Sequence, residues 1–168
     1  ICFTFDNPLR RLLHPAPRIL RPFVAPGDRV LDLGPGIGYF TLPLARIAGP
    51  EGAVVAADIQ PRMLDALARR AARRGVTGIR TAVVGQDPAR PLDALDPDER
   101  FDFILMFWML HEVRDRDALL RDARRRLSPR GAILLAEPLG HVPPATFDRE
   151  IAAAEAAGLT VTARPPIA

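Results

Sequence analysis

VLDLGPGIGYF, the sequence of residues 30–40, decides the fold. An apolar run that is typical of a buried strand ends in three glycines, Gly34, Gly36 and Gly38, and a helical pattern follows. Glycines at such a turn let the chain reverse tightly and let a ligand approach the backbone. Asp58 closes the next apolar run, and a carboxylate at that place can accept hydrogen bonds from both hydroxyls of a ribose. The stretch therefore predicts a strand–turn–helix unit that binds a nucleotide.

The spacing of the glycines distinguishes between classes of nucleotide. Dinucleotide sites follow the pattern G-x-G-x-x-G, whereas this chain has G-x-G-x-G, with Tyr39 where the last small residue is needed. A large ring at that place crowds the path of a pyrophosphate. Asp32 opposes a pyrophosphate too, but it suits the ammonium group of a methionine tail. The pattern favours S-adenosylmethionine as the cofactor and leaves a nicotinamide-dependent oxidoreductase as the weaker alternative.

Strand-like and helix-like segments alternate along the rest of the chain. We expect strands at 29–33, 53–59, 79–84, 101–109, 132–136 and 159–163, and helices at 39–48, 61–74, 115–127 and 145–157. Helices between successive strands imply parallel βαβ units with right-handed crossovers. The prediction is an α/β fold, a Rossmann-like doubly wound and mostly parallel sheet with helices on both faces.

The domain organisation follows from changes in composition. We predict one domain over residues 1–168, in which the Pro- and Arg-rich segment 1–26 forms an N-terminal helical cover. Residues 27–163 are expected to form the Rossmann-like core. The polar, Pro-broken stretch 87–100 is expected to be a surface loop.

Composition excludes several classes of protein. With Cys2 as the only cysteine, neither a disulfide framework nor a multi-cysteine metal site is available, and no metal is expected. The longest uncharged apolar run, 103–110, has eight residues, far fewer than the roughly 20 that cross a bilayer. No charged-then-apolar leader opens the sequence. We therefore expect a cytoplasmic protein without a membrane partner.

The formal net charge is +3, and all 23 basic residues are Arg. Two Arg-dense stretches have helical spacing and consist of Arg69, Arg70, Arg73 and Arg74, and of Arg121, Arg124, Arg125 and Arg126. Our first interpretation is that both are solvated helix faces. The alternative is a patch for an acidic partner such as RNA, which requires the charges to cluster in space.

Five segments together carry a family resemblance: VLDLGPGIG, AADIQPRML, VVGQD, FDFILMFWMLHEV and LLRDARRRLSPRGAILLAEP. In this order they resemble the motifs of class I S-adenosylmethionine-dependent methyltransferases. The resemblance is strongest to the small enzymes of the ubiquinone/menaquinone-biosynthesis and arsenite-methyltransferase type, and it covers about residues 27–163. It implies methyl transfer from S-adenosylmethionine to a small-molecule acceptor.

The resemblance also assigns cofactor contacts. Gly34, Gly36 and Gly38 border the methionine tail, Asp58 holds the ribose, Ile59 packs on the adenine, and Asp87 accepts from the adenine amino group. We further expect Phe107 to contact the cofactor as part of its wall, with a place in the core as the alternative. A backbone N–H after the adenine-binding acid is common in the family, but Pro88 has none. The family's final antiparallel strand is expected to be missing here. An open sheet edge invites pairing with another chain, so a homodimer is one expectation.

The acceptor pocket is expected after the fourth strand, at residues 106–112. Histidine is a common general base in enzymes, so His111 can take a proton from a hydroxyl or acidic carbon, or it shapes the pocket without a catalytic role. Tyr39 and His141 are further candidates for the pocket wall. The segment lacks the D/N-P-P-Y/F pattern of enzymes that methylate planar amino groups, and it lacks the Cys of the arsenite and pyrimidine-carbon enzymes. A cofactor-binding module with an RNA or protein partner remains an alternative.

Overall fold

The computed structural model describes residues 14–85, 87 and 89–167, and its central feature is a parallel sheet. The strands are β1 (Arg29–Leu33), β2 (Ala53–Asp58), β3 (Ile79–Val83), β4 (Phe101–Phe107) and β5 (Leu127–Ala136). They lie in the order β3-β2-β1-β4-β5, and every neighbouring pair is parallel. This order confirms the predicted α/β Rossmann-like class. The single-domain prediction stays a prediction.

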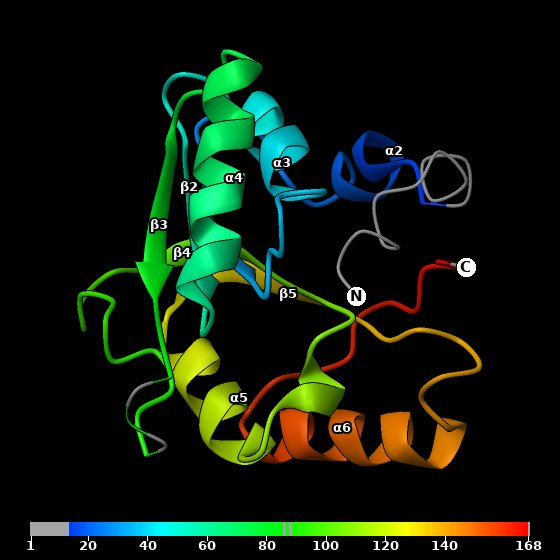
Figure 1. Cartoon of the computed structure of the whole chain (residues 1–168). Helices are drawn as coiled ribbons and strands as arrows, with labels where there is room; N and C mark the ends of the chain where they lie inside the picture. The colour runs from blue at the N-terminus through cyan, green and yellow to red at the C-terminus, as the bar shows by residue number, and fades with distance from the viewer. Residues whose placement is uncertain (1–13, 86, 88, 168) are drawn as a thin grey trace.

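Helices cover both faces of the sheet. The helices are α2 (Ala16–Leu20), α3 (Thr41–Ala48), α4 (Pro61–Arg73), α5 (Arg116–Arg125) and α6 (Pro144–Ala156), with a short 3-10 turn, η2 (Leu110–Glu112), after β4. One face packs against α2, α3 and α4, and α5 and α6 lie side by side on the other (Figure 1). Within the expected helical cover at 1–26, the structure has one helix, α2, among the described residues 14–26. Residues 1–13 lie outside the described part.

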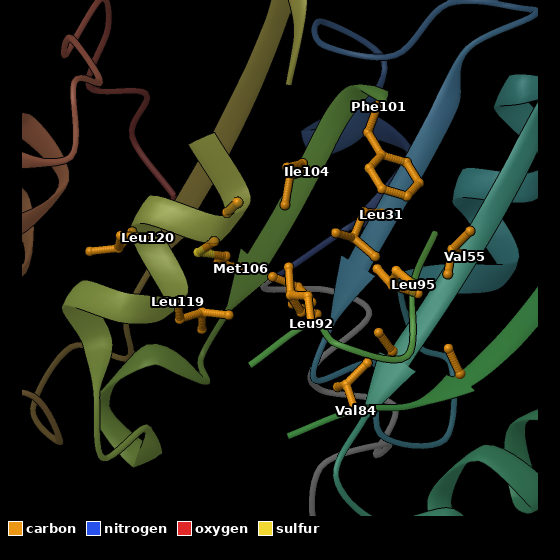
Figure 2. Packing of buried hydrophobic residues seen from close by; sticks show 14 of the residues in the cluster. Leu31, Val55, Val84, Leu92, Leu95, Phe101, Ile104, Met106, Leu119 and Leu120 are labelled. Carbon is orange, nitrogen blue, oxygen red and sulfur yellow. The ribbon is translucent and has the colours of Figure 1, made fainter. Parts of the chain in front are cut away.

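The alternation of side chains along β4 explains why its sequence from Phe103 to Phe107 is continuously apolar. Phe103, Leu105 and Phe107 point into the cluster with α2 and α3. Ile104 and Met106 point into the cluster on the opposite face, with α5 (Figure 2). A parallel strand that is covered on both faces must be apolar at every position.

Strand order reverses between β1 and β4, and this reversal places the site. After β1 the chain moves outward through β2 to β3 and then returns to the other side of β1 as β4. Helices leaving β1 and β4 diverge to opposite faces, which opens a crevice at the carboxyl ends of these strands. The glycine turn after β1, Asp58 at the end of β2, and the turn after β4 all lie at that edge.

The predicted sixth strand at 159–163 is wrong. Gly158 adopts φ 85°, and the N–H of Leu159 bonds back to the carbonyl of Ala154, so the chain turns against the end of α6. Leu159 packs into the cluster with α5 instead of pairing with β5. Val161, the next apolar residue of the segment, is 37% exposed, and the sheet described here has five strands with no antiparallel neighbour.

The predicted loop at 87–100 is less exposed than its composition indicates. Leu92 and Leu95 are buried and belong to the core cluster with α5 (Figure 2). Arg126 donates to the carbonyls of Asp96 (2.6 Å) and Leu92 (3.0 Å). Asp122 accepts from the N–H of Leu92 at 3.1 Å and lies 3.4 Å from the Arg126 guanidinium. An ion pair at the end of α5 therefore anchors the segment.

The two arginine stripes do not form one patch. Arg126 is buried in the anchor described above, and Arg70 is buried and donates to the carbonyl of Ile37. The other members of both stripes are exposed. Because α4 and α5 cover opposite faces of the sheet (Figure 1), the exposed arginines of the two stripes lie on different sides of it. Over the part of the chain that the structure describes, no helix is long and apolar enough to cross a membrane.

Substitution of Arg126 by Met tests the anchor. The change leaves the carbonyls of Leu92, Leu95 and Asp96 and the Asp122 carboxylate without their buried partner, so we expect the free energy of unfolding to fall by about 2–4 kcal/mol in urea denaturation. Arg121→Met, at an exposed position on the same helix, is the matched control and should change it by less than about 0.5 kcal/mol. Equal effects of the two substitutions would contradict the anchor.

Candidate active site

The three glycines after β1 all have positive φ but differ in their surroundings. A Cβ at Gly34 would lie 2.9 Å from the Cβ of Met109, and one at Gly38 would lie 2.9 Å from a methyl of Leu42. A Cβ at Gly36 would meet nothing within 4 Å. Gly34 and Gly38 therefore permit close packing of the turn, whereas Gly36 faces open space. This open space is where a ligand can approach the backbone.

Asp58 ends β2 beside this turn. Its Oδ1 accepts a hydrogen bond from the N–H of Gln60 at 2.9 Å. Burial is the largest influence and raises the pKa of the Asp58 carboxyl, while the N–H groups of Gln60, Gly36 and Ile59 lower it. The carboxylate thus lies against the backbone of the Gly36 turn, as a ribose-binding acid at this crevice requires.

Asp32 lies behind the turn and is 2% exposed. Its Oδ2 accepts a hydrogen bond from the hydroxyl of Thr41 at 2.6 Å. Burial raises the pKa of Asp32 to about 7; the Thr41 bond lowers it and the charge of Asp58 raises it further. An ammonium group brought close to this carboxyl would favour its ionised form. The sequence analysis did not identify Thr41, which lies at the first position of α3.

Ile59 and Asp87 are the predicted adenine contacts. Ile59 is 65% exposed, and its Cγ2 is 2.8 Å from the place where a Cβ of Gly85 would be. An apolar side chain exposed beside a glycine offers a flat surface to an adenine ring. The Asp87 carboxylate accepts from the N–H of Ala89 (2.9 Å) and pairs with Arg90 (3.2 Å), and these contacts lower its pKa. Its role toward adenine stays a prediction, and Pro88 lies outside the described residues.

Phe107 and Tyr39 are already engaged within the protein. Phe107 is buried with its ring 4.3 Å from that of Phe40 and belongs to the core cluster, so the structure does not present it as an open cofactor wall. The Tyr39 hydroxyl donates to the carbonyl of His14 at 2.7 Å and so ties α3 to the segment before α2. Trp108, next to Phe107, has φ 61°, a left-handed conformation that costs about 1–2 kcal/mol for a bulky residue.

His111 makes a close pair with Glu137, which the sequence analysis missed. Nδ1 of His111 is 2.6 Å from Oε2 of Glu137, and the backbone N–H of His111 donates to Oε1 at 3.1 Å. The Glu137 side chain is buried, and the ring of His141 lies edge-on to that of His111 at 5.1 Å. Glu137 follows β5 directly, just as Asp58 ends β2. An acid at the carboxyl end of a predicted strand is the sequence feature that could have identified Glu137 as a site residue.

The residues predicted to bind the nucleotide part of the cofactor and the His111–Glu137 pair lie at the same edge of the sheet. Nε2 of His111 is 4.0 Å from Oε1 of Glu112. Glu112 in turn is close enough to Asp58 for its charge to raise the pKa of that carboxyl. Within residues 14–85, 87 and 89–167, no group of three or more His, Cys, Asp or Glu side chains is arranged to hold a metal ion.

Comparison with known families gives one matching model, the methyltransferase domain, which covers residues 30–131 and so more than half of the chain. The chain belongs to this family. It is a class I S-adenosylmethionine-dependent methyltransferase domain, as the order of its sequence motifs predicted, and S-adenosylmethionine is its cofactor.

Curated relatives place the domain near one group of enzymes. It is 38% identical over 112 residues to the ubiquinone/menaquinone biosynthesis C-methyltransferase UbiE of Shewanella sp. (strain ANA-3), covering 67% of this chain and 43% of the relative. It is 37% identical over 114 residues to the UbiE of Pasteurella multocida, covering 68% and 41%. The chain thus spans under half the length of these relatives.

Solved structures share the fold. A SAM-dependent methyltransferase from Aquifex aeolicus superimposes with a TM-score of 0.78 and 24% identity, covering 95% of this chain and 87% of that one. An arsenic (III) S-adenosylmethionine methyltransferase from Chlamydomonas reinhardtii gives 0.66 and 22% identity, covering 79% and 52%. At these identities the likeness concerns the fold alone.

The residues of the methyltransferase domain fit its cofactor. The open space at Gly36 can receive the ligand's atoms, Asp58 offers an acceptor at the ribose position, and exposed Ile59 offers an apolar surface for adenine. Asp32, although buried, provides a carboxyl for the ammonium end. The individual contacts remain predictions, and two substitutions test them.

Gly36→Ala tests the open space of the turn. Alanine there fills the region without a protein neighbour, so we expect S-adenosylmethionine affinity to fall by tenfold or more, at least about 1.4 kcal/mol, in calorimetric titration. Gly75→Ala is the matched control, because Gly75 has nearly the same φ (59° against 54°) and an equally open Cβ position after α4. Both variants should lose about 1 kcal/mol of stability through backbone strain. Unchanged affinity in Gly36→Ala would place the cofactor elsewhere.

Asp32 predicts a pH dependence of cofactor binding. With its pKa at about 7, the carboxyl is mostly protonated at pH 5.5 and half ionised at pH 7.0. Because the ionised form attracts the ammonium group, the association constant for S-adenosylmethionine should rise on the order of tenfold over this interval. Asp32→Asn should remove most of this rise. A wild-type constant that is independent of pH, or an unaltered dependence in the variant, would contradict the assignment.

Proposed function

We propose that this domain transfers a methyl group from S-adenosylmethionine to a hydroxylated aromatic small molecule, with His111 as the base that takes the hydroxyl proton. The observation that carries the proposal is the contact between His111 Nδ1 and Glu137 Oε2 at 2.6 Å. It lies beside the nucleotide residues, at the place where the family's acceptor pocket begins.

The geometry of the pair supports a base at Nε2. When Nδ1 carries the hydrogen and donates it to Glu137, the tautomer is fixed and the lone pair of Nε2 is available. The second bond, from the His111 N–H to the same carboxylate, fixes the ring relative to its own backbone. When Nε2 takes a proton, the negative charge of Glu137 stabilises the resulting imidazolium.

Methyl transfer requires little else from the protein. When bound, S-adenosylmethionine supplies an electrophilic methyl group on a positively charged sulfur. The domain has to hold the acceptor atom in line with that group at about 3–3.5 Å and keep water away. Loss of a phenolic proton to His111 raises the electron density on the oxygen and on the neighbouring ring carbons. The same base therefore serves O- and C-methylation.

Three observations support this acceptor class. The curated relatives are named as C-methyltransferases of ubiquinone/menaquinone biosynthesis, and a reduced quinone ring carries hydroxyl groups beside nucleophilic carbons. The sequence lacks the cysteines for arsenite and the D/N-P-P-Y/F motif for planar amino groups. The arginines of α4 and α5 lie on opposite faces, which favours a small molecule over an RNA acceptor.

The test measures release of S-adenosylhomocysteine with a panel of acceptors. We expect turnover with 1,4-dihydroxynaphthalene and catechol, kept reduced, and none with arsenite, adenine or RNA. His111→Gln should lower kcat/KM for the accepted phenols on the order of 10²–10⁴-fold, because the base is lost. Its affinity for S-adenosylmethionine should stay within twofold of wild type. A fully active His111→Gln, or activity confined to the non-phenolic acceptors, would refute the proposal.

A further inference from the structure

The turn that carries His111 is held from α5 by one side chain. Arg116, the first residue of α5, donates from Nε to the carbonyl of Leu110 (3.0 Å) and from Nη2 to the carbonyl of His111 (2.9 Å). The planar guanidinium thus bonds two successive carbonyls of η2. The start of α5 is itself fixed, because the Asp115 side chain accepts from the N–H of Ala118 at 2.8 Å. A turn of three residues has few bonds of its own, so Arg116 determines its placement.

A buried carboxyl stands behind this arginine. Glu150 of α6 is 1% exposed, and its Oε1 lies 3.5 Å from Nε of Arg116. Neither carboxyl oxygen has a hydrogen-bond partner among the described residues. A buried acid without hydrogen bonds is expensive and calls for an explanation. Burial raises the pKa of Glu150 and the charge of Glu137 raises it further, whereas Arg116 and His111 lower it.

We infer that Arg116 and Glu150 are positioning residues for His111: Arg116 holds the η2 turn by its carbonyls, and Glu150 fixes the arginine from α6 and balances its charge. The inference rests on the proposed role of His111 as the base. In this arrangement α5 and α6, which contribute no atom to the reaction, hold the His111–Glu137 pair in place.

Arg116 and Glu150 also contribute to the electrostatic environment of the His111 ring. The charged and titratable groups around it are Glu112 on η2, Arg116 on α5, Glu150 on α6, and Glu137 and His141 after β5, with Arg149 of α6 acting on Glu150. The positive charge of Arg116 disfavours the imidazolium, and a negative charge on Glu150 favours it. Removing one or the other should therefore shift the pH dependence of turnover in opposite directions. If the two substitutions acted only through lost packing, they would not shift the pH dependence in opposite directions.

Kinetics with 1,4-dihydroxynaphthalene separate placement from charge. Arg116→Lys keeps the charge but cannot bond both carbonyls in the same plane, so kcat should fall about tenfold with an unchanged acid limb of the pH–rate profile. Arg116→Met should lower kcat at least as much and move the acid limb to higher pH. Glu150→Gln should move it to lower pH and lower kcat several-fold. KM for S-adenosylmethionine should stay within twofold in all three variants.

Two exposed residues on the same helices are the matched controls. Arg121→Met on α5 and Glu155→Gln on α6 change the same charges away from the site and should behave as wild type. Proton NMR of the ligand-free domain adds a readout that needs no acceptor. The Nδ1–H of His111 should be slow to exchange in wild type and in both controls, and it should exchange rapidly in Arg116→Lys.

The outcomes separate the inference from the function on which it rests. If His111→Gln is fully active, the proposed base is wrong. If His111→Gln is inactive but Arg116→Lys and Glu150→Gln keep wild-type kcat, pH profile and exchange, the base stands and the positioning role is wrong. If Arg116→Met and Glu150→Gln shift the acid limb in the same direction, the charge argument is overturned. Circular dichroism checks that each variant is folded. If Arg116→Met does not fold, Arg116→Lys tests the positioning role in its place.

Discussion

Parallel pairing of β1 with both β2 and β4 is the constraint on which the rest of the structure depends. Since all the strands point the same way, their carboxyl ends form one edge, and the reversal of order between β1 and β4 separates the helices that follow. Groups from distant parts of the sequence therefore gather at one crevice. Asp58 arrives from β2 and Glu137 from β5, and neither needs a long loop to reach it.

The same edge carries buried acids at an energetic cost. Burial raises the pKa of Asp32, Asp58 and Glu150, which means that each is held in an environment that disfavours its charge. A protein that served stability alone would have replaced them with apolar groups of similar volume. Trp108, held at a positive φ directly after β4, is a further strained element in the same place. Such costs are concentrated where a site needs fixed polar groups.

Much of the fold could be predicted because its signals are local. The glycine turn, the continuous apolar run of β4 and the alternation of elements all lie within short windows of sequence. The expected strand at 159–163 failed because an apolar alternation does not reveal what the residues pack against, and Leu159 packs on helices. Over its described residues, the stretch 87–100 is a loop without a helix or strand, as predicted, but its polar composition did not reveal that Leu92 and Leu95 are buried.

The site was predictable only in part. Asp58 lies at a fixed distance from the glycines, and His111 lies in a recognisable motif. Glu137, Arg116 and Glu150 act through tertiary contacts whose spacing in the sequence carries no periodic signal. The sequence left Phe107 open between the core and the cofactor wall; its side chain points into the core cluster, and its role toward the cofactor stays a prediction.

Helix α5 holds two separate segments of the chain, the η2 turn and the stretch 87–100. At its first residue α5 holds the turn of His111 through Arg116, and just beyond its last residue Arg126 holds the segment that begins at Asp87. Ten helical residues span about 15 Å, and a helix of this length behaves as a stiff rod. The turn of His111 and the segment 87–100 are therefore attached to opposite ends of one helix. An insertion within α5 would change both the separation and the relative rotation of these two attachments, because each added residue lengthens the helix by about 1.5 Å and turns it by about 100°.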